Sequence, residues 1–424
     1  MSEAPKRYLP VRPNLDQLKH QAKELLRLFR GGDSAAVEEF KEQGRGNVLP
    51  AEAKLSDAQL VLAWSYQAPS WPRLVLACRL VDAIWRDDLE TVREIVVRHP
   101  NLLHEDALVR PSNWGPPMSY AANLGRDRII EMLHEMGARD HAKAFNRAAL
   151  QTRIGTARRL HAMMDFPKLP DGALGDPAYT LSADGTAMLF ELGARVMDKH
   201  GNRLAPVDVV LETDSRKPAA KHEILEMYVQ HGLTLPNTAP MALHRGRIDL
   251  LEEHLRRDPL LLRRRFRFDE IYPSEMGCHD EVMATHGTPL AGATLLHMCV
   301  DYDEMEIALW LLERGMDVDE KAAVDADGFG GHTALFSTVV SQPNSWANRS
   351  GEPVTAPFTK LLLEHGADPN VRASLRKQLH PGYGDEPMRE YRNVTPLSWG
   401  ERFHRKEFVN AEAMRLIVER GGRG

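Results

Sequence analysis

The chain has 424 residues, of which 43% are hydrophobic and 27% are charged, a composition that is typical of globular proteins and argues against a disordered chain. The formal net charge of -6 excludes a global electrostatic attraction to nucleic acid or to anionic membranes. The three cysteines are widely spaced and form no C-x-x-C pair, which argues against a disulfide framework and a four-cysteine zinc site. The length exceeds that of most single cores, so two domains or a repeat array are expected.

The N-terminal residues contain no apolar segment of the length that a signal peptide requires. Elsewhere, no apolar run approaches the roughly 20 residues that cross a bilayer. Together with the cysteine usage, these features predict a cytoplasmic protein without a membrane partner.

The first predicted element is an amphipathic helix close to the N-terminus. Asn14 is suited to cap its first turn with Gln17 as the reciprocal partner, and Gly31-Gly32 ends it. Its apolar residues recur at steps of three, four and seven and therefore form one face. These residues are Leu15, Leu18, Ala22, Leu25, Leu26 and Phe29.

Two shorter helices are predicted next. One follows Asp33 and directs Val37 and Phe40 inward. The other begins at Ser56, where Gln59 completes a capping box.

Over about the first seventy residues, the sequence carries a distinctive pattern made up of Leu9-Pro10, Arg12-Pro13, Leu15, Leu18, residues 21–26, Leu55, Ala58-Gln59 and residues 70–74. This segment resembles a region found ahead of ankyrin repeats in many bacterial proteins. The resemblance implies a small helical capping segment and no activity, because a terminal repeat would otherwise expose an apolar face. A separate ligand-binding role is the alternative.

A six-residue phrase recurs along the rest of the chain, in the order apolar, apolar, any, Glu or Gln, any, Gly. Each copy has the form of a helix C-terminus, at which glycine adopts the left-handed conformation after the last turn. We therefore predict positive φ angles at these glycines, above all at positions 137, 193, 315 and 366. The copies end at Gly137, Gly193, Gly232, Gly315, Gly366 and Gly421.

A second phrase precedes most of these helix ends and resembles the T-P-L-H-x-A-A start of the ankyrin repeat. Its threonine can cap a helix, its proline is tolerated in the first turn, and its leucine enters the core. Residues 364–370 also match the exit of the second ankyrin helix. The copies of the second phrase lie at residues 117–122, 294–297, 333–336 and 395–398, with a looser copy at 240–244.

The resemblance implies an all-α, ankyrin-type helical solenoid of paired antiparallel helices over residues 74–424. Its repeats are degenerate, because Gly193 to Gly232 is 39 residues and Gly366 to Gly421 is 55, against an ankyrin period of about 33. We expect roughly eight or nine units. The units are hardest to place within residues 142–180.

Three insertions, residues 267–291, 341–356 and 372–393, are polar, rich in Gly or Pro, and interleaved with aromatic residues. That composition is typical of recognition loops, although an insertion can also be merely tolerated. We expect the aromatic residues among them to be at least partly exposed along one edge, because loops in equivalent positions of successive repeats project in register. The predicted binding residues are Tyr272, Glu275, His279, Asp280, His286, Trp346, His380, Tyr383, Asp385 and Tyr391.

No catalytic or metal-binding pattern in the sequence is complete. His297 and Cys299 stand two residues apart on a predicted helix and would point to different sides. The calcium-loop-like run 325–330 has Ala334 where an EF-hand needs a bidentate Glu. We therefore predict no metal site, no cofactor and no catalytic residues.

The expected function is that of a monomeric, non-enzymatic scaffold that binds a protein partner through its concave face and inserted loops. An enzyme or small-molecule binder with a pocket between the inserted loops is the alternative. A weaker alternative is nucleic-acid binding through the arginine run at residues 256–267, although such a run also suits a solvated helix end. The run consists of Arg256, Arg257, Arg263, Arg264, Arg265 and Arg267.

Overall fold

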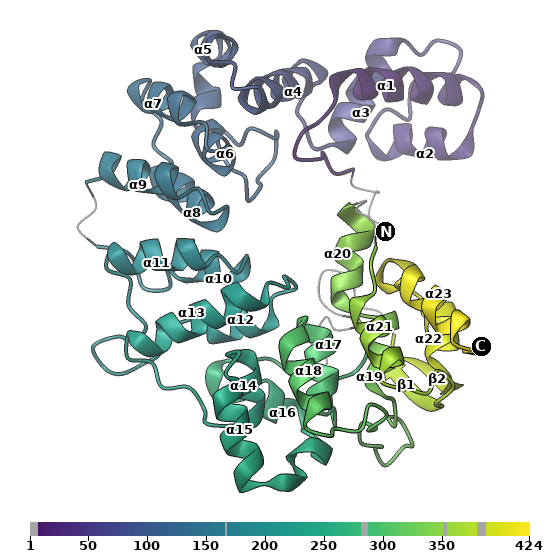
Figure 1. The fold of residues 1–424 in the computed structure, drawn as a ribbon. Coiled ribbons are helices and arrows are strands. Elements are labelled where there is room, and N and C mark those ends of the chain that lie inside the picture. Colours follow the sequence, from purple (N-terminus) through teal and green to yellow (C-terminus); the bar gives the residue numbers. More distant parts are fainter. Residues whose placement is uncertain (1–6, 166–167, 281–286, 351–353, 380–386) are drawn as a thin grey trace. The chain divides into compact units, whose positions relative to one another are not determined.

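A computed structural model describes residues 7–165, 168–280, 287–350, 354–379 and 387–424 of the chain, apart from some side chains within 346–350. The chain is mostly helical and divides into two compact units, Met1–Leu169 and Pro170–Gly424 (Figure 1). Within the described segments, no helix combines the length and the hydrophobicity that crossing a membrane requires.

The first unit is built from helices throughout its described residues. They are α1 (Leu15–Arg30), α2 (Ser34–Glu42), α3 (Leu55–Ser65), α4 (Trp71–Trp85), α5 (Leu89–Arg98), η1 (Pro100–Leu103), α6 (Pro117–Leu124), α7 (Asp127–Glu135), α8 (His141–Leu150) and α9 (Ile154–Met163).

The helix starts near the N-terminus follow from local capping, with two departures from the sequence prediction. The Asn14 side chain accepts hydrogen bonds from the first turn of α1, as predicted. Val37 is 38% exposed, so its predicted inward position is wrong, whereas Phe40 is fully buried. The helix α3 begins one residue early, because the carboxylate of Asp57 accepts a hydrogen bond from the Lys54 N–H at 2.9 Å. The predicted capping box at Ser56 is therefore wrong.

The helices α1, α2 and α3 share one buried core with the start of α4. In α1 and α2, Phe29 stacks on Phe40 with ring centroids 3.7 Å apart. Leu74 and Cys78 of α4 belong to the same buried cluster. The apolar contacts therefore continue past residue 73 into the helices that follow.

The second unit adds a short hairpin to its helices. Its helices are α10 (Gly175–Tyr179), α11 (Ala183–Glu191), α12 (Val207–Glu212), α13 (Pro218–Gln230), α14 (Ala239–His244), α15 (Ile248–Arg257), η2 (Pro259–Arg263), α16 (Phe268–Ile271), η3 (Ser274–Met276), α17 (Leu295–Tyr302), α18 (Met305–Glu313), α19 (Ala334–Val339), α20 (Gln342–Ser350), α21 (Pro357–Glu364), α22 (Pro396–Arg402), η4 (Lys406–Phe408) and α23 (Ala411–Glu419). Its strands are β1 (Ala373–Lys377) and β2 (Arg389–Val394), which pair antiparallel.

Helices within each unit pack in consecutive pairs. In the first unit, α4 packs on α5, α6 on α7 and α8 on α9, and the helices α4, α6 and α8 also pack on one another in succession. In the second unit, α17 packs on α18 and α22 on α23, while α19 lies between α17 and α22. Figure 1 shows these pairs along the chain.

The recurrent glycines end their helices as predicted. Gly137, Gly193, Gly315 and Gly366 have φ angles of 96°, 93°, 89° and 88°. No atom of the surrounding structure lies within 4 Å of a Cβ placed on Gly366. The left-handed backbone, and not a close approach, therefore explains the glycine at that position.

The second insertion is not a loop, because residues 342–350 form the helix α20. Its polar residues hold this helix against the segment around η4. The Asn344 amide donates hydrogen bonds to the carbonyl oxygens of Val339 and Phe408, and the Asn348 amide donates to those of Glu407 and Val409. Asn344 and Asn348 thus have a structural role.

Candidate binding surface

Three connecting segments of the second unit each fold back on themselves. The first loop (residues 264–293) closes where the Phe266 N–H donates a hydrogen bond to the Ala293 carbonyl at 2.8 Å. The second loop (residues 317–332) closes at a bridge between Val324 and Gly330. The third loop (residues 367–394) carries the β1–β2 hairpin.

Backbone hydrogen bonds join these loops to one another. The Ala323 N–H of the second loop donates to the Gly292 carbonyl of the first at 2.8 Å. The Gly330 N–H of the second loop donates to the Ser374 carbonyl of the third at 2.6 Å. The described parts of the three loops therefore form one continuous surface, which we call the linked-loop surface.

Glycines permit this close approach. Gly330 has a φ of 118°, and a Cβ on it would overlap the carbonyl oxygen of Ala323. A Cβ on Gly292 would lie 2.6 Å from the Cβ of Ala323. A larger side chain at Gly292 would separate the first loop from the second, and one at Gly330 would force the second loop open.

Two buried histidines, His297 and His332, donate hydrogen bonds to the backbone of the first and second loops. The Nε2–H of His297 donates to the His332 carbonyl at 3.1 Å, and the Nε2–H of His332 donates to the Pro289 carbonyl at 3.1 Å. Burial lowers the pKa of His297 to about 4 and that of His332 to about 3, so both rings are neutral at pH 7. The hydroxyl of Thr294 lies 2.8 Å from the Nδ1 of His297. His297 thus holds the end of the second loop.

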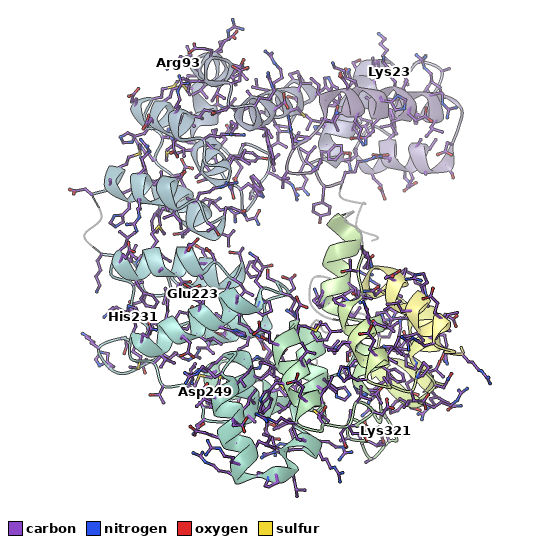
Figure 2. All side chains as sticks on the ribbon, viewed as in Figure 1. Lys23, Arg93, Glu223, His231, Asp249 and Lys321 are labelled. Atoms are coloured by element: carbon purple, nitrogen blue, oxygen red, sulfur yellow. The ribbon has the colours of Figure 1, made fainter. Side chains whose placement is uncertain are left out.

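A cavity of about 500 Å³ opens among the three loops. Its apolar wall includes Phe266, Phe268, Pro289, Phe329, Leu375 and Met388. Its charged lining consists of Arg265, Arg267, Arg376, Lys377 and Asp325. Lys321, labelled in Figure 2, belongs to the second loop, and its carbonyl oxygen accepts a hydrogen bond from the Nε of Arg265 at 2.8 Å.

Two of the predicted binding residues are buried, so their expected exposure is wrong. Tyr272 is 1% exposed, and its ring stacks on Phe268 with centroids 4.8 Å apart. Tyr391 is 5% exposed, because its ring packs edge-on against Trp399 and its hydroxyl lies 2.6 Å from the Nδ1 of His404. Both side chains face the interior of the unit and are poor candidates for partner contacts.

Three other predicted residues, Glu275, His279 and Asp280, are exposed on the first loop. The ring of His279 pairs with Glu212 at 2.6 Å, which raises the pKa of the histidine. This ion pair fastens the loop to α12. None of the three lines the cavity.

The remaining predicted residues cannot be placed relative to the linked-loop surface. His286, His380, Tyr383 and Asp385 lie outside the described residues. Trp346 lies in α20, and its side chain is not among those that the structure describes.

The calcium-like run forms a turn that is closed by an arginine. The carboxylate of Asp325 accepts hydrogen bonds from the N–H groups of Asp327 and Phe329, each at 2.9 Å. Both aspartates pair with Arg376, at 2.8 and 2.9 Å. Across the described part of the chain, no cluster of His, Cys, Asp or Glu side chains could hold a metal ion.

Most of the arginine run is paired with carboxylates. The pairs are Arg257 with Glu253, Arg264 with Glu270, Arg265 with Glu320, and Arg267 with Asp269, at 2.8 to 3.1 Å. A nucleic acid would have to compete with these pairs for the guanidinium groups.

A buried charged cluster between α13 and the α17–α18 junction was not predicted. Lys221 and Glu304 are each 3% exposed, and the Nζ of Lys221 lies 2.7 Å from the Oε1 of Glu304. The Nε2–H of His222 donates to the same oxygen at 2.8 Å. Next to this group, Arg216 pairs with Asp301 at 3.2 Å, and both side chains are buried. No sequence pattern indicated these pairs, because the partners are more than 80 residues apart.

Comparisons with known proteins add little. No family model matches the chain, and no curated protein matches its sequence. Among solved structures, the chain is similar to the crystal structure of the human ASB11 ankyrin repeat domain at 14% sequence identity and a TM-score of 0.27. That match covers 73% of this chain and 99% of the other. A likeness at that score carries no weight for the fold or the function.

Proposed function

We propose that the chain is an ankyrin-type helical solenoid with degenerate repeats that binds a protein partner and carries out no catalysis. Support for the solenoid comes from the stacked helix pairs and from the phrases that begin and end them. Both repeat phrases coincide with helix termini, as at Thr294 before α17 and Gly315 after α18. Residues 1–73 would cap the array, in a monomer that functions in the cytoplasm.

The observation that carries the binding proposal is the linked-loop surface itself. Hydrogen bonds between neighbouring loops hold the described backbone around them in one arrangement, so little ordering of these residues is required when a partner binds. Two apolar side chains stand out on this surface, Val324 at 60% and Met388 at 48% exposure. Exposed apolar groups on a preformed surface are typical of the centre of a protein interface.

The experiment begins with affinity purification of the tagged full chain from its native host, followed by mass spectrometry of the retained proteins. Isothermal titration calorimetry then compares the purified partner's affinity for the native chain and for a Val324→Asp, Met388→Asp double variant. We expect the double variant to bind at least about tenfold more weakly, which corresponds to about 1.4 kcal/mol. Its melting temperature should stay nearly unchanged, because both side chains are exposed.

The matched control is a Val97→Asp, Leu260→Asp double variant, whose altered side chains are 62% and 69% exposed and lie outside the linked-loop surface. It carries the same added charge. Native affinity of the loop variant together with weakened binding of the control would refute the proposal.

The charge of the chain favours protein binding over nucleic-acid binding. The chain is acidic overall, and at least four of the six arginines in the run already pair with carboxylates. A phosphate backbone requires several cations that are available together.

A further inference from the structure

The cavity among the three loops is unevenly charged. Four cations line it, namely Arg265, Arg267, Arg376 and Lys377, against a single carboxylate, Asp325. Asp325 is itself engaged by the N–H groups of Asp327 and Phe329 and by Arg376. The cations on the lining thus outnumber its one carboxylate, although each arginine also pairs with a carboxylate outside the lining.

The three arginines are held in place by carboxylates that do not line the cavity. Arg265 pairs with Glu320 at 2.8 Å, Arg267 with Asp269 at 2.9 Å, and Arg376 with Asp327 at 2.9 Å. These carboxylates are absent from the cavity wall. Arg376 also pairs with Asp325, and Arg265 also donates to the Lys321 carbonyl oxygen. Each guanidinium is thus oriented by its partners, and it offers five N–H donors, more than these contacts occupy.

The rest of the cavity is apolar. Phe266 and Leu375 are each 1% exposed and form a rigid part of the wall. The Phe329 ring is backed by the guanidinium groups of Arg376 and Arg392, whose central carbons lie 4.9 and 4.3 Å from its centroid. A volume of about 500 Å³ falls within the range of cavities that hold small ligands, roughly 300–1,000 Å³.

We propose that this cavity binds a small organic anion in which a carboxylate is attached to an aromatic or branched aliphatic group. The apolar body of the ligand packs against the phenylalanine and leucine side chains, and its carboxylate is attracted by the arginines at the rim. A neutral analogue keeps the apolar packing and loses the attraction to the arginines. This site goes beyond the proposed protein binding and does not depend on it.

The test uses three naphthalene probes that differ in charge: 2-naphthoate, 2-naphthamide and 2-naphthylmethylammonium. Each is titrated into the full chain in the absence of any partner protein, with binding followed by isothermal titration calorimetry. We expect the naphthoate to bind up to about fivefold more tightly than the amide, since an exposed ion pair contributes up to about 1 kcal/mol. The ammonium probe should bind most weakly of the three.

Variants locate the binding. Ala291→Trp places a large ring at an exposed position of the wall and should abolish binding of the naphthoate and the amide alike. Arg267→Glu reverses a charge at the rim, where the arginine is 73% exposed, and should weaken the naphthoate about fivefold while sparing the amide. The matched control Arg256→Glu changes an exposed arginine that does not line the cavity and should bind all probes like the native chain.

Equal binding of the three probes would overturn the proposal. So would naphthoate binding that survives both Ala291→Trp and Arg267→Glu. Because these titrations contain no partner, their failure would leave the protein-binding proposal to be judged on its own experiment.

Discussion

Replacing Glu304 with Gln should destabilise the second unit, because the substitution leaves Lys221 as a buried charge without its counter-charge. The Nζ of Lys221 lies 2.7 Å from the carboxylate and 4.4 Å from the centroid of the Tyr302 ring. Burial acts to raise the pKa of Glu304, whereas Lys221 and His222 act to lower it. The lowering effects together are larger, so the pKa of Glu304 is below its usual value and the carboxyl group is ionised at pH 7. Burial also lowers the pKa of Lys221, which Glu304 opposes.

The expected loss follows from the burial of both groups. Each side chain is 3% exposed, and removing one partner of a buried ion pair costs about 3–5 kcal/mol. For a unit of roughly 250 residues, each kcal/mol lowers the melting temperature by about 2–4 °C, so a fall of roughly 6–20 °C is expected. Neutralising both partners should cost far less, because no unpaired charge then remains buried.

The assay is thermal and urea unfolding of the full chain, followed by circular dichroism, for Glu304→Gln and for the double variant Lys221→Met, Glu304→Gln. The control is Glu412→Gln, which removes an exposed ion pair with Arg415 and should leave the melting temperature nearly unchanged. The reasoning is refuted if Glu304→Gln costs less than about 1 kcal/mol. It is equally refuted if the double variant is as unstable as the single one.

Three further predictions concern stability. His297 and His332 have folded pKa values of about 4 and about 3. Their contribution to the free energy of unfolding is therefore present above pH 6.5 and is lost as the pH falls through those values. The expected loss is roughly 3 kcal/mol for His297. Urea unfolding at a series of pH values should show this loss, and His297→Gln should flatten it; an unchanged pH profile in that variant would show that other groups dominate. Gly366→Val should cost about 1 kcal/mol or more through backbone strain alone, whereas a native melting temperature would mean that the φ of 88° is easily relaxed. Tyr391→Ala should cost about 3–5 kcal/mol as a buried aromatic, and Tyr391→Phe should cost about 1 kcal/mol for the hydrogen bond to His404; weakened partner binding without lost stability would restore Tyr391 as an interface residue.

Local features of the fold were readable from the sequence. Asn14 caps α1 through its own side chain, and Gly366 follows the end of α21 in a left-handed conformation. Both depend on residues within one or two helical turns. Even so, neighbouring polar residues can compete to cap the same helix end. For this reason the cap of α3 involves Asp57 instead of the predicted Ser56.

The sequence did not allow us to predict which side chains of the insertions are exposed. Tyr391 lies on β2, where burial does not alternate along the strand and the pairing with β1 contains a register irregularity, so the sequence pattern does not tell which residues are buried. Residues 341–356 were assigned to a loop for their polarity, yet Asn344 and Asn348 use their amides to hold α20 against a segment about 60 residues away.

The candidate site depends on contacts between distant segments. The cavity requires three loops to meet, and one of the bonds that joins them runs from Gly330 to Ser374. The sequence analysis noted a calcium-loop-like run at residues 325–330 and an insertion at 372–393, but no local pattern indicates that they lie side by side. The same holds for Lys221 and Glu304, since charged residues on helices are most often solvated.

Hydrogen–deuterium exchange on the purified complex with the identified partner tests the proposed binding surface most directly. We predict that the partner slows exchange in residues 320–332 and in the described parts of the third loop, residues 367–379 and 387–394. Exchange in α4 and α5 should not change. Protection confined to helices outside the three loops, with unaltered exchange within them, would contradict the assignment of the linked-loop surface as the partner-binding face.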